Sequence, residues 1–409
     1  RWVVLPQTDL EAELADLTGN SPSPEVISSA RDLFSVAIET PGGLKVQTIH
    51  AFCERLLQRF PLEAGIPPKF AILDDETGRQ LRTEAIDATL RIAARDPEGH
   101  LAAALNTVIA WAVDDTFDAL LADMLAKRDW IEAVDRLDHQ GSDVRSGVET
   151  VLRRMLGIHP RSTRDGVDLK LATVLSDADI DRSRAALLQG STTDCKLAEL
   201  LAAARTASDR RYRIEALRDL FLVGKDVPRK SMVTKAIGKQ FPEIEQLLDA
   251  AREEFHKAYC ERTSLVMLEA NVALLLVSVE VMRRYTDLKQ RRAALDFDDL
   301  IRRTVALLSS SAQAQWVLYK LDGGIDHILV DEAQDTSPEQ WKIVEALAAE
   351  FFSGEGAAAG VPRTLFAVGD EKQSIYGFQG AAPEKFAEVG HRFEAAAKAQ
   401  ARAYAAYSR

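Results

Sequence analysis

Two adjacent acids, Asp331 and Glu332, directly follow the short apolar run "HILV" of residues 327–330. A short apolar run bounded by glycines and acids is typical of a buried parallel strand. Ligands of open parallel sheets bind beyond the carboxyl ends of the strands, which is where these carboxylates stand. Asp331 is therefore placed to hold Mg²⁺, which prefers carboxylate and phosphate oxygens. Glu332 beside it could orient and deprotonate an attacking water.

A second stretch, "TLFAVGDEKQ" (residues 364–373), repeats this construction. Its apolar part predicts another buried strand, which ends in Gly369 and Asp370 and is followed by Gln373. A neutral amide at Gln373 could sense a γ-phosphate or the attacking water without adding charge. Acids after a single strand are most often a solvated turn. Two such motifs in the same context instead predict a nucleotide site bordered by Gly369, Asp370 and Gln373.

The elements that must position these residues form two α/β segments separated by a helical one. Residues 1–75 combine amphipathic helices with a stretch at residues 44–50 that alternates like a strand. Residues 76–295 are rich in alanine and leucine with a recurring 3.6-residue period, which predicts one large helical domain. The α/β pattern returns at residues 296–390, and residues 391–409 predict an Ala-rich helix. We therefore expect an α/β fold, a parallel sheet with helices, interrupted by a large all-α insertion domain.

The composition is that of a globular protein with an acidic balance. Of the 409 residues, 46% are hydrophobic, and the formal net charge is −12. This charge argues against a basic surface overall, although a local groove can still be positive and bind nucleic acid. The three cysteines form no C-x-x-C pair, so we expect a reducing, cytoplasmic location rather than disulfides or a zinc site. The most apolar run, residues 272–279, is too short to span a bilayer and predicts a buried helix, so no membrane partner is expected.

Several sequence motifs together resemble one protein family. "ILVDEAQD" and "AVGDEKQSIYGFQGA" resemble motifs II and III of the UvrD/Rep/RecB-like superfamily 1 DNA helicases. "VQTIHAFCERLL" resembles an early DNA-contacting motif of that family, and "LDFDDLI" resembles the segment that re-enters the first core domain after its helical insertion. The longer stretches "ETPGGLKVQTIHAFCERLLQRFP" and "WVLYKLDGGIDHILVDEAQDTSPEQW" are similar to the AddA subunit of bacterial AddAB helicase–nucleases, in its alphaproteobacterial form.

This resemblance implies a partial RecA-like P-loop NTPase core that uses ATP and Mg²⁺. Asp331 would be the Mg²⁺ ligand, Glu332 the catalytic base and Gln373 the γ-phosphate sensor. The implied function is an ATP-dependent DNA helicase that moves on single-stranded DNA in double-strand break repair and recombination. The implied partners of the full-length protein are single-stranded and duplex DNA and an AddB-like protein in a heterodimer. The implied domains are residues 1–75 as the first part of the core, 76–295 as the helical insertion, 296–390 as the second part of the core with motifs II and III, and 391–409 as a helix leading to a second core domain.

The resemblance also implies DNA contacts at two places. Tyr376 and Phe378 fall where the family stacks aromatics near single-stranded DNA, and base–aromatic stacking tolerates any sequence. Thr48, His50 and Phe52 would lie along the DNA track. Core packing is an equal alternative for Phe52, because this residue also fits the apolar stripe of a helix. Helix capping is an alternative for His50.

One motif of the family is missing from this sequence. A P-loop, G-x-x-x-x-G-K-[ST], would cradle the phosphates, but the Gly-Lys pairs at residues 224–225 and 238–239 lack its other residues. The sequence also has Gln379 where many relatives carry an arginine that couples the DNA and nucleotide sites. Because the chain begins with Arg1, and the P-loop, second core and nuclease domain would lie outside it, we expect an internal piece that alone is inactive.

Other interpretations remain open at this point. The chain could be a stand-alone DNA-binding or scaffold module without ATPase activity. Asp296, Asp298 and Asp299 could also join Asp331 and Glu332 in a nuclease metal site, although "DFDD" is typical of a helix start. Basic clusters of the helical domain could touch duplex phosphates, or each could be a solvated helix face. These clusters are Arg153-Arg154, Arg210-Arg211-Arg213, Arg283-Arg284 and residues 289–292.

Overall fold

The computed structural model describes residues 2–39, 46–112, 115–139, 144–309, 311–322, 325–352, 363–370, 372, 374 and 383–399. The chain divides into two compact units, residues 1–75 with 290–409 and residues 76–289, which we call the core unit and the helical unit. Three predicted site residues, Gln373, Tyr376 and Phe378, lie outside the described residues, as does Gln379.

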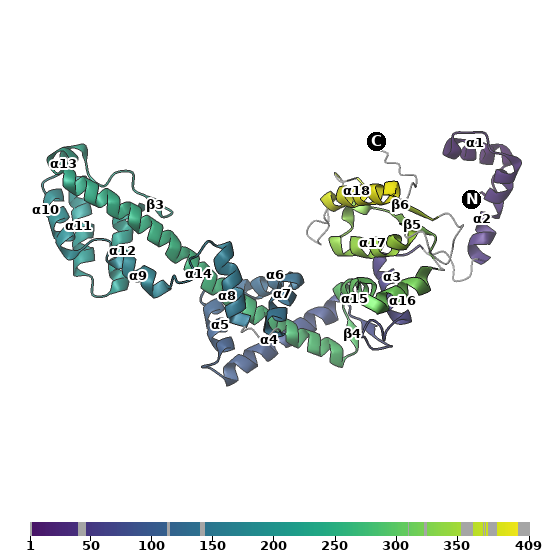
Figure 1. Cartoon of the computed structure of the whole chain (residues 1–409), viewed down its shortest axis with the longest axis horizontal. Coiled ribbons are helices and arrows are strands. Elements are labelled where there is room, and N and C mark those ends of the chain that lie inside the picture. The colour runs from purple at the N-terminus through teal and green to yellow at the C-terminus, as the bar shows by residue number, and fades with distance from the viewer. Residues whose placement is uncertain are drawn as a thin grey trace. The chain divides into compact units, whose positions relative to one another are not determined.

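The core unit combines helices with short parallel strands (Figure 1). β1 pairs with β4 and β5 pairs with β6, so segments far apart in the sequence meet in both sheets. The elements are α1 (Gln7–Thr18), α2 (Pro24–Glu39), α3 (Ile49–Arg59), β1 (Ala71–Ile72), β4 (Ala294–Leu295), α15 (Phe297–Ser309), α16 (Ser311–Asp322), β5 (His327–Val330), the one-turn 3₁₀-helix η1 (Ala333–Asp335), α17 (Pro338–Phe352), β6 (Thr364–Ala367) and α18 (Pro383–Ala399).

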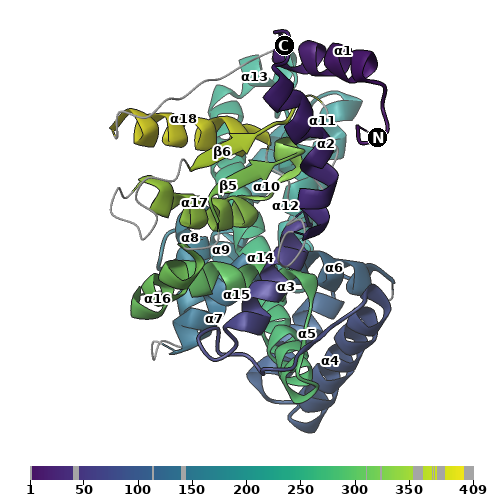
Figure 2. The same cartoon turned by 90° about the vertical axis from the view of Figure 1, so that its right-hand side faces the viewer.

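The β5–β6 pair has one covered face and one open face. Because the strands are parallel and in register, their carboxyl ends lie at the same edge. Alternate side chains pack against α17 and α18 beside Trp341, and these helices lie next to the strands in both views (Figures 1 and 2). Leu329 and Phe366 point the other way and are 74% and 57% exposed. The prediction of fully buried strands is therefore wrong for this pair, because helices pack on one of its faces alone in the described part of the unit.

Local sequence signals set where helices begin in the core unit. Thr48 is the N-cap of α3, and its side-chain oxygen accepts a hydrogen bond from the Ala51 N–H at 3.2 Å. At α17, the Ser337 hydroxyl accepts from the Gln340 N–H, and Gln340 Oε1 accepts from the Ser337 N–H at 2.9 Å, which is a capping box. The predicted strand at residues 44–50 is wrong: residues 46–48 form no strand, and the Thr48 cap starts a helix at Ile49.

The helical unit is built around one long helix, α14, which has 50 residues and a length of about 75 Å at 1.5 Å per residue. Helices α9–α13 pack along its N-terminal part in one apolar core (Figure 1). Near its C-terminal end, Tyr285 is 1% exposed and packs beneath cations of α4 and α7. The elements are α4 (Asp75–Arg95), α5 (His100–Ile109), α6 (Asp115–Leu125), α7 (Arg128–His139), α8 (Val144–Met155), α9 (Arg164–Ala172), α10 (Asp177–Leu187), α11 (Thr192–Thr206), α12 (Arg210–Phe221), β2 (Leu222–Val223), β3 (Val227–Pro228), α13 (Lys235–Gln240) and α14 (Pro242–Arg291).

One stretch of α14 resembles a membrane span in length and composition. An 18-residue window has a mean hydropathy of 2.0, yet half of that window is buried inside the structure. Val272, Leu275 and Val279 are among its buried residues. The prediction of a buried helix at residues 272–279 is therefore confirmed, and this stretch contributes to the core of the helical unit.

The expected fold class is confirmed in its coarse form. The chain is mostly helical, and both pairs in the core unit are small parallel sheets, as an α/β fold requires. Strand is scarcer than the α/β prediction implies, because the described strands are two or four residues long.

Candidate functional site

Asp331 and Glu332 stand exposed at the carboxyl end of β5, where the sequence predicts the chemistry. The Glu332 N–H donates to Asp331 Oδ1 at 3.0 Å, which fixes the Asp331 carboxylate over the strand end. Glu332 itself has a left-handed backbone, with φ of 49° and ψ of 45°. For a residue other than glycine this conformation is strained and persists where the surroundings impose it. Here the Ala333 N–H donates to the Val368 carbonyl at 2.9 Å and ties the turn to the end of β6.

Gln334 joins the ends of the two strands, and sequence reasoning missed it. Its side chain is 2% exposed. Its Nε2 donates to Glu332 Oε2 at 2.6 Å, and its Oε1 accepts from the Asp370 N–H at 2.9 Å. In the sequence it shows only as a glutamine inside "DEAQD". Its contact with Asp370 spans 36 residues, so the local pattern does not reveal it. The structure thus brings together Glu332 and Asp370, two of the predicted site residues.

The segment after β6 is held against η1 at further points. Gly369 is exposed, and a Cβ built on it would lie 2.4 Å from Gln334 Oε1, so this position has no room for a side chain. Asp370 Oδ1 accepts from the Lys372 N–H at 3.0 Å. The Ser374 hydroxyl donates to Asp335 Oδ1 at 3.0 Å. Gly369 and Asp370 therefore lie at the same edge of the strand pair as Asp331 and Glu332.

The acids at this edge fit Mg²⁺ held mainly by water and phosphate. No group of three or more His, Cys, Asp or Glu side chains able to hold a metal occurs among the described residues. The described part of the chain therefore has no metal site in which protein side chains supply all the ligands. Mg²⁺ commonly takes one or two carboxylates together with nucleotide phosphates, and an exposed Asp331 suits that mode.

His50 and Phe297 form an aromatic pair on the surface of the core unit. Their ring centroids lie 5.5 Å apart at an interplanar angle of 84°, an edge-to-face contact. Phe297 is 47% exposed. Burial lowers the pKa of His50 below its ordinary value, and the charge of Asp298 opposes that shift. Because the imidazole is neutral near pH 7, it adds to an apolar surface rather than a cationic one. Sequence reasoning missed Phe297, whose signal is its place in "LDFDDLI".

The other two residues predicted in the early DNA-contacting motif have structural contacts. Thr48 uses its hydroxyl as the cap of α3 and is exposed. Phe52 is half-buried and packs against the core that contains Cys53 and Leu56. Core packing, the alternative for Phe52, is therefore what the structure shows. Thr48, not His50, caps the helix.

Comparison with known proteins decides the family. The family model of the UvrD/REP helicase N-terminal domain matches residues 23–394. The chain belongs to the UvrD/REP helicase family. Its relatives include AddA proteins of bacterial ATP-dependent helicase/nucleases. The AddA of Lactiplantibacillus plantarum is 24% identical over 410 residues, which cover 95% of this chain and 32% of that protein.

Two further AddA relatives show how much of such a protein this UvrD/REP helicase chain covers. The helicase/nuclease protein of Desulfitobacterium hafniense is 35% identical over 119 residues, covering 28% of this chain and 8% of that protein. That of Latilactobacillus sakei is 24% identical over 411 residues, covering 94% of this chain and 44% of that protein. The chain spans about a third of the length of the first curated relatives it matches.

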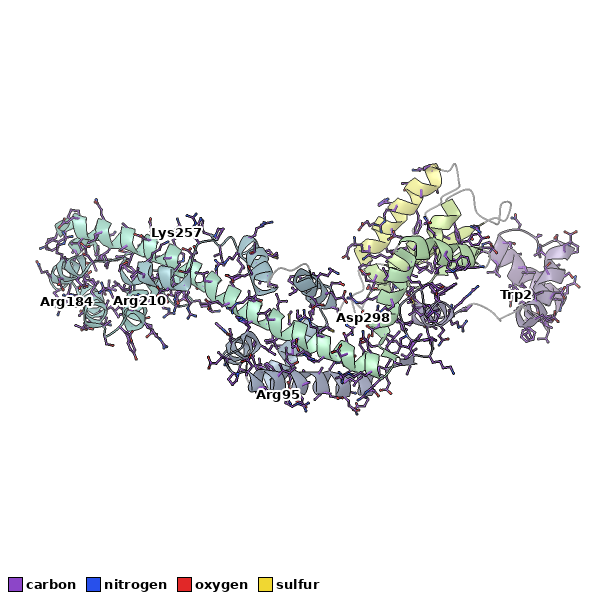
Figure 3. The ribbon with its side chains drawn as sticks, turned by 60° about the horizontal axis from the view of Figure 1, so that its bottom comes forward. Trp2, Arg95, Arg184, Arg210, Lys257 and Asp298 are labelled. Atoms are coloured by element: carbon purple, nitrogen blue, oxygen red, sulfur yellow. The ribbon has the colours of Figure 1, made fainter. Side chains whose placement is uncertain are left out.

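In this UvrD/REP helicase chain, arginines of the basic clusters at residues 153–154, 210–213 and 283–284 pair with acids. Arg153 is bound by Glu149 at 2.8 Å, and Arg213 by Asp177 at 2.8 Å. Figure 3 shows Arg184, Arg210 and Lys257 among the many charged side chains of this unit. Since acids share the same faces, the interpretation as solvated, ion-paired helix surface is favoured over a basic groove. The other pairs are Arg210–Asp165, Arg211–Glu215, Arg283–Asp135 and Arg284–Glu280.

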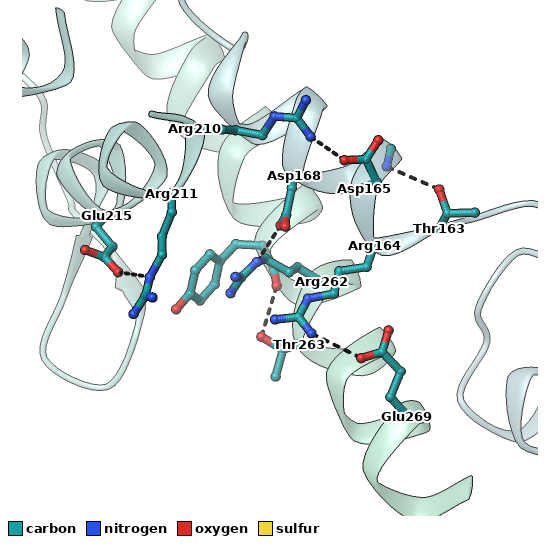
Figure 4. A network of polar contacts seen from close by, with 12 residues as sticks. Thr163, Arg164, Asp165, Asp168, Arg210, Arg211, Glu215, Arg262, Thr263 and Glu269 are labelled. Atoms are coloured by element: carbon teal, nitrogen blue, oxygen red, sulfur yellow. Dashed lines mark hydrogen bonds and ion pairs between the residues drawn. The ribbon is translucent and has the colours of Figure 1, made fainter. Parts of the chain in front are cut away.

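Two further ion pairs hold α9 against α14. Arg262 of α14 donates to Asp168 of α9 at 2.6 Å, and Arg164 pairs with Glu269 at 3.2 Å (Figure 4). The residues of the two pairs are 94 and 105 positions apart in the sequence. These contacts are structural ties between helices.

The nuclease interpretation of "DFDD" is not supported by the contacts of its acids. Asp296 and Asp299 cap α15 reciprocally: the Asp299 N–H donates to Asp296 Oδ1 at 2.9 Å, and the Asp296 N–H donates to Asp299 Oδ2 at 3.1 Å. Asp298 pairs with Arg302 at 3.0 Å. The three acids thus begin the helix, as the sequence pattern predicts.

Proposed function

We propose that this chain is part of the motor core of an ATP-dependent DNA helicase related to the AddA proteins of bacterial helicase/nucleases. The proposal includes movement on single-stranded DNA in double-strand break repair and recombination, a cytoplasmic location, and an AddB-like partner for the whole protein. The observation that carries it is the pairing of Asp331 and Glu332 with Gly369 and Asp370 at one edge of a parallel strand pair. Membership of the UvrD/REP helicase family supports the use of ATP.

In the proposed mechanism each acid has a separate task. Asp331 would hold Mg²⁺, which supplies positive charge to the phosphates of bound ATP. Glu332 would orient the attacking water and accept its proton. Gln373 remains a predicted γ-phosphate sensor, and it lies three residues beyond Asp370 in the sequence. Phosphoryl transfer depends mostly on positioning and electrostatics, so the rigid turn that holds Glu332 suits this task.

The open face of the β5–β6 pair supports a larger RecA-like core in the whole protein. Parallel sheets occur almost only with both faces covered. Leu329, Phe366 and Val368 are exposed by 74%, 57% and 48% on the uncovered side. Further elements of the proposed core would cover these residues.

The proposed DNA track passes over the His50–Phe297 pair. An exposed aromatic ring beside a neutral imidazole offers a stacking platform for bases of any sequence. Thr48, Tyr376 and Phe378 stay predicted contacts of the same track, and Phe52 contributes to the packing beneath it.

A matched pair of substitutions tests the DNA track. Stacking is worth about 1–3 kcal/mol per base, so Phe297→Ala should weaken binding of a fluorescent oligothymidylate about 5- to 150-fold. Trp316→Ala is the control, because Trp316 is also aromatic, lies in the same unit and is 47% exposed, as Phe297 is. Fluorescence anisotropy at one fixed salt concentration measures both. Equal affinities of the two variants would contradict the proposed track.

The ATPase part is tested with Glu332→Gln. In the whole protein, DNA-stimulated ATP hydrolysis should fall about 10²- to 10⁴-fold, because a general base is removed. The 409-residue chain, whose sequence has no P-loop, should hydrolyse ATP at background rate. Hydrolysis by this chain that rises with single-stranded DNA and is lost in Glu332→Gln would contradict the assignment of an incomplete site.

A further inference from the structure

The amide of Gln334 has a defined orientation because of its two partners. A backbone N–H can only donate, so the atom facing the Asp370 N–H at 2.9 Å must be the amide oxygen. The amide nitrogen is then the atom that faces the Glu332 carboxylate at 2.6 Å. A hydrogen bond from an N–H to a carboxylate is short and strong, as this one is. Gln334 therefore presents a fixed donor to Glu332.

The Gln334 amide is closely packed. Gln334 is 2% exposed, and a Cβ at Gly369 would come within 2.4 Å of its Oε1 and 2.9 Å of its backbone nitrogen. The φ of Gly369 is not in the left-handed region, so close approach rather than backbone freedom explains the glycine. The absence of a side chain at Gly369 thus leaves the space in which the Gln334 amide reaches the end of β6.

The Glu332 side chain is held from two directions. Its backbone holds a left-handed conformation, at φ of 49°. The Gln334 amide then fixes one of its carboxylate oxygens. Without the amide, an exposed glutamate on a turn would sample several rotamers, and a catalytic group that is misplaced by 1 Å can lose about 100-fold in rate.

We propose that Gln334 is a positioning residue that orients Glu332 and makes this orientation depend on the segment following β6. The inference rests on the proposed role of Glu332 as the general base. The chain of contacts runs from the Glu332 carboxylate through the Gln334 amide to the Asp370 backbone. The Ser374 hydroxyl, bonded to Asp335 at 3.0 Å, gives the same segment a second anchor on η1. A shift of the Asp370 backbone therefore moves the donor that holds Glu332.

The first test needs no enzymatic activity. In the 409-residue chain labelled with ¹⁵N-glutamine, the Gln334 side-chain resonance is the one lost in Gln334→Met. Glu332→Ala removes the acceptor, so it should shift the Gln334 NH₂ resonance and speed its hydrogen exchange. Asp331→Ala, which alters the neighbouring acid, should leave that resonance in place. An unchanged Gln334 resonance in Glu332→Ala would overturn the proposal.

The second test separates positioning from folding in the whole protein. Gln334→Met keeps the shape but loses both hydrogen bonds. Gln334→Glu keeps the acceptor for the Asp370 N–H and places a carboxylate opposite Glu332. Both should lower kcat about 10- to 100-fold with the KM for ATP within about twofold of wild type. The control is Gln340→Met, which removes an amide bonded to the Ser337 N–H at the start of α17.

The two tests also separate this inference from the proposed function. A loss of kcat in Gln334→Met and Gln334→Glu, with wild-type kcat in Gln340→Met, supports positioning. Wild-type kcat in Gln334→Glu, or an equal loss in Gln340→Met, would overturn it. If the wild-type whole protein shows no DNA-stimulated ATPase, the proposed function fails, and the resonance experiment still decides whether Gln334 orients Glu332.

Discussion

Replacing Asp194 with asparagine should destabilise the helical unit far more than an ordinary surface change. Asp194 is 0% exposed. Its Oδ2 accepts from the Ser191 N–H, the Ser191 hydroxyl and the Thr234 hydroxyl, each at 2.8 Å, and its Oδ1 accepts from the Thr234 N–H at 2.9 Å. These four bonds tie the start of α11 to the segment before α13.

The size of the loss follows from the donors that surround the carboxylate. An asparagine oxygen would take the Oδ2 position, where three donors converge, and its NH₂ would then face the Thr234 N–H. One buried N–H loses its acceptor and the other bonds lose a charged acceptor, so we expect the free energy of unfolding to fall by about 2–3 kcal/mol. Asp181→Asn is the control, because Asp181 is an exposed acid whose side chain is 58% accessible.

The effect should also depend on pH, with a defined sign. Burial raises the pKa of Asp194, but the hydrogen bonds from Thr234 and Ser191 outweigh it and leave the pKa below its ordinary 3.8. The native state therefore binds the proton more weakly than the unfolded state. The stabilisation is complete above the unfolded value and is lost as pH falls through the lower native value.

Urea unfolding followed by hydrogen-exchange mass spectrometry of α11 peptides measures this unit separately from the core unit. The difference between wild type and Asp194→Asn should be full at about pH 7 and smaller at about pH 3. A difference below roughly 0.5 kcal/mol at neutral pH, the size of an ordinary surface substitution, would refute the reasoning. So would a difference that grows as the pH is lowered.

Two further predictions concern the core unit. Burial holds the pKa of His50 below its ordinary 6.5, so the free energy of unfolding should fall as pH drops from about 7 to 5. His50→Gln should remove part of that fall in urea unfolding curves. Identical pH profiles of wild type and His50→Gln would contradict the lowered pKa. Burial raises the pKa of Cys53 to about 11, so in the native protein the exposed Cys260 should be alkylated by iodoacetamide well before Cys53. Mass spectrometry of the alkylated peptides checks the order, and equal rates would refute the buried, protonated state of Cys53.

Sequence signals located the candidate site because they are local. The acids after "HILV" and the Gly-Asp after "TLFAV" sit at the carboxyl ends of β5 and β6 because an apolar run and its polar end are read within ten residues. The Ser337 helix start and the Asp296–Asp299 cap were also predictable, since both are bonds across three residues. The prediction of a strand at residues 44–50 was wrong because a few alternating residues fit both the two-residue period of a strand and the 3.6-residue period of a helix. The Thr48 cap favours the helix that begins at Ile49.

The contacts that complete the site were beyond sequence reasoning because they are long-range. Gln334 meets Asp370 across 36 residues, and nothing in a single sequence specifies that meeting. His50 and Phe297 come from distant parts of the chain. Some of the ion pairs of the basic clusters were beyond sequence reasoning because the acid lies on another helix, as with Arg283 and Asp135, which are 148 residues apart.

The left-handed backbone of Glu332 has a consequence for protein engineering. A side chain in this region costs about 1 kcal/mol or more of backbone strain, which glycine would relieve. Methods that improve thermostability by removing strained positive-φ residues would therefore select position 332 as a target. The substitution they favour would delete the proposed base of the reaction. A stabilised version of this chain intended to keep its chemistry should leave that strain in place and seek its gains elsewhere.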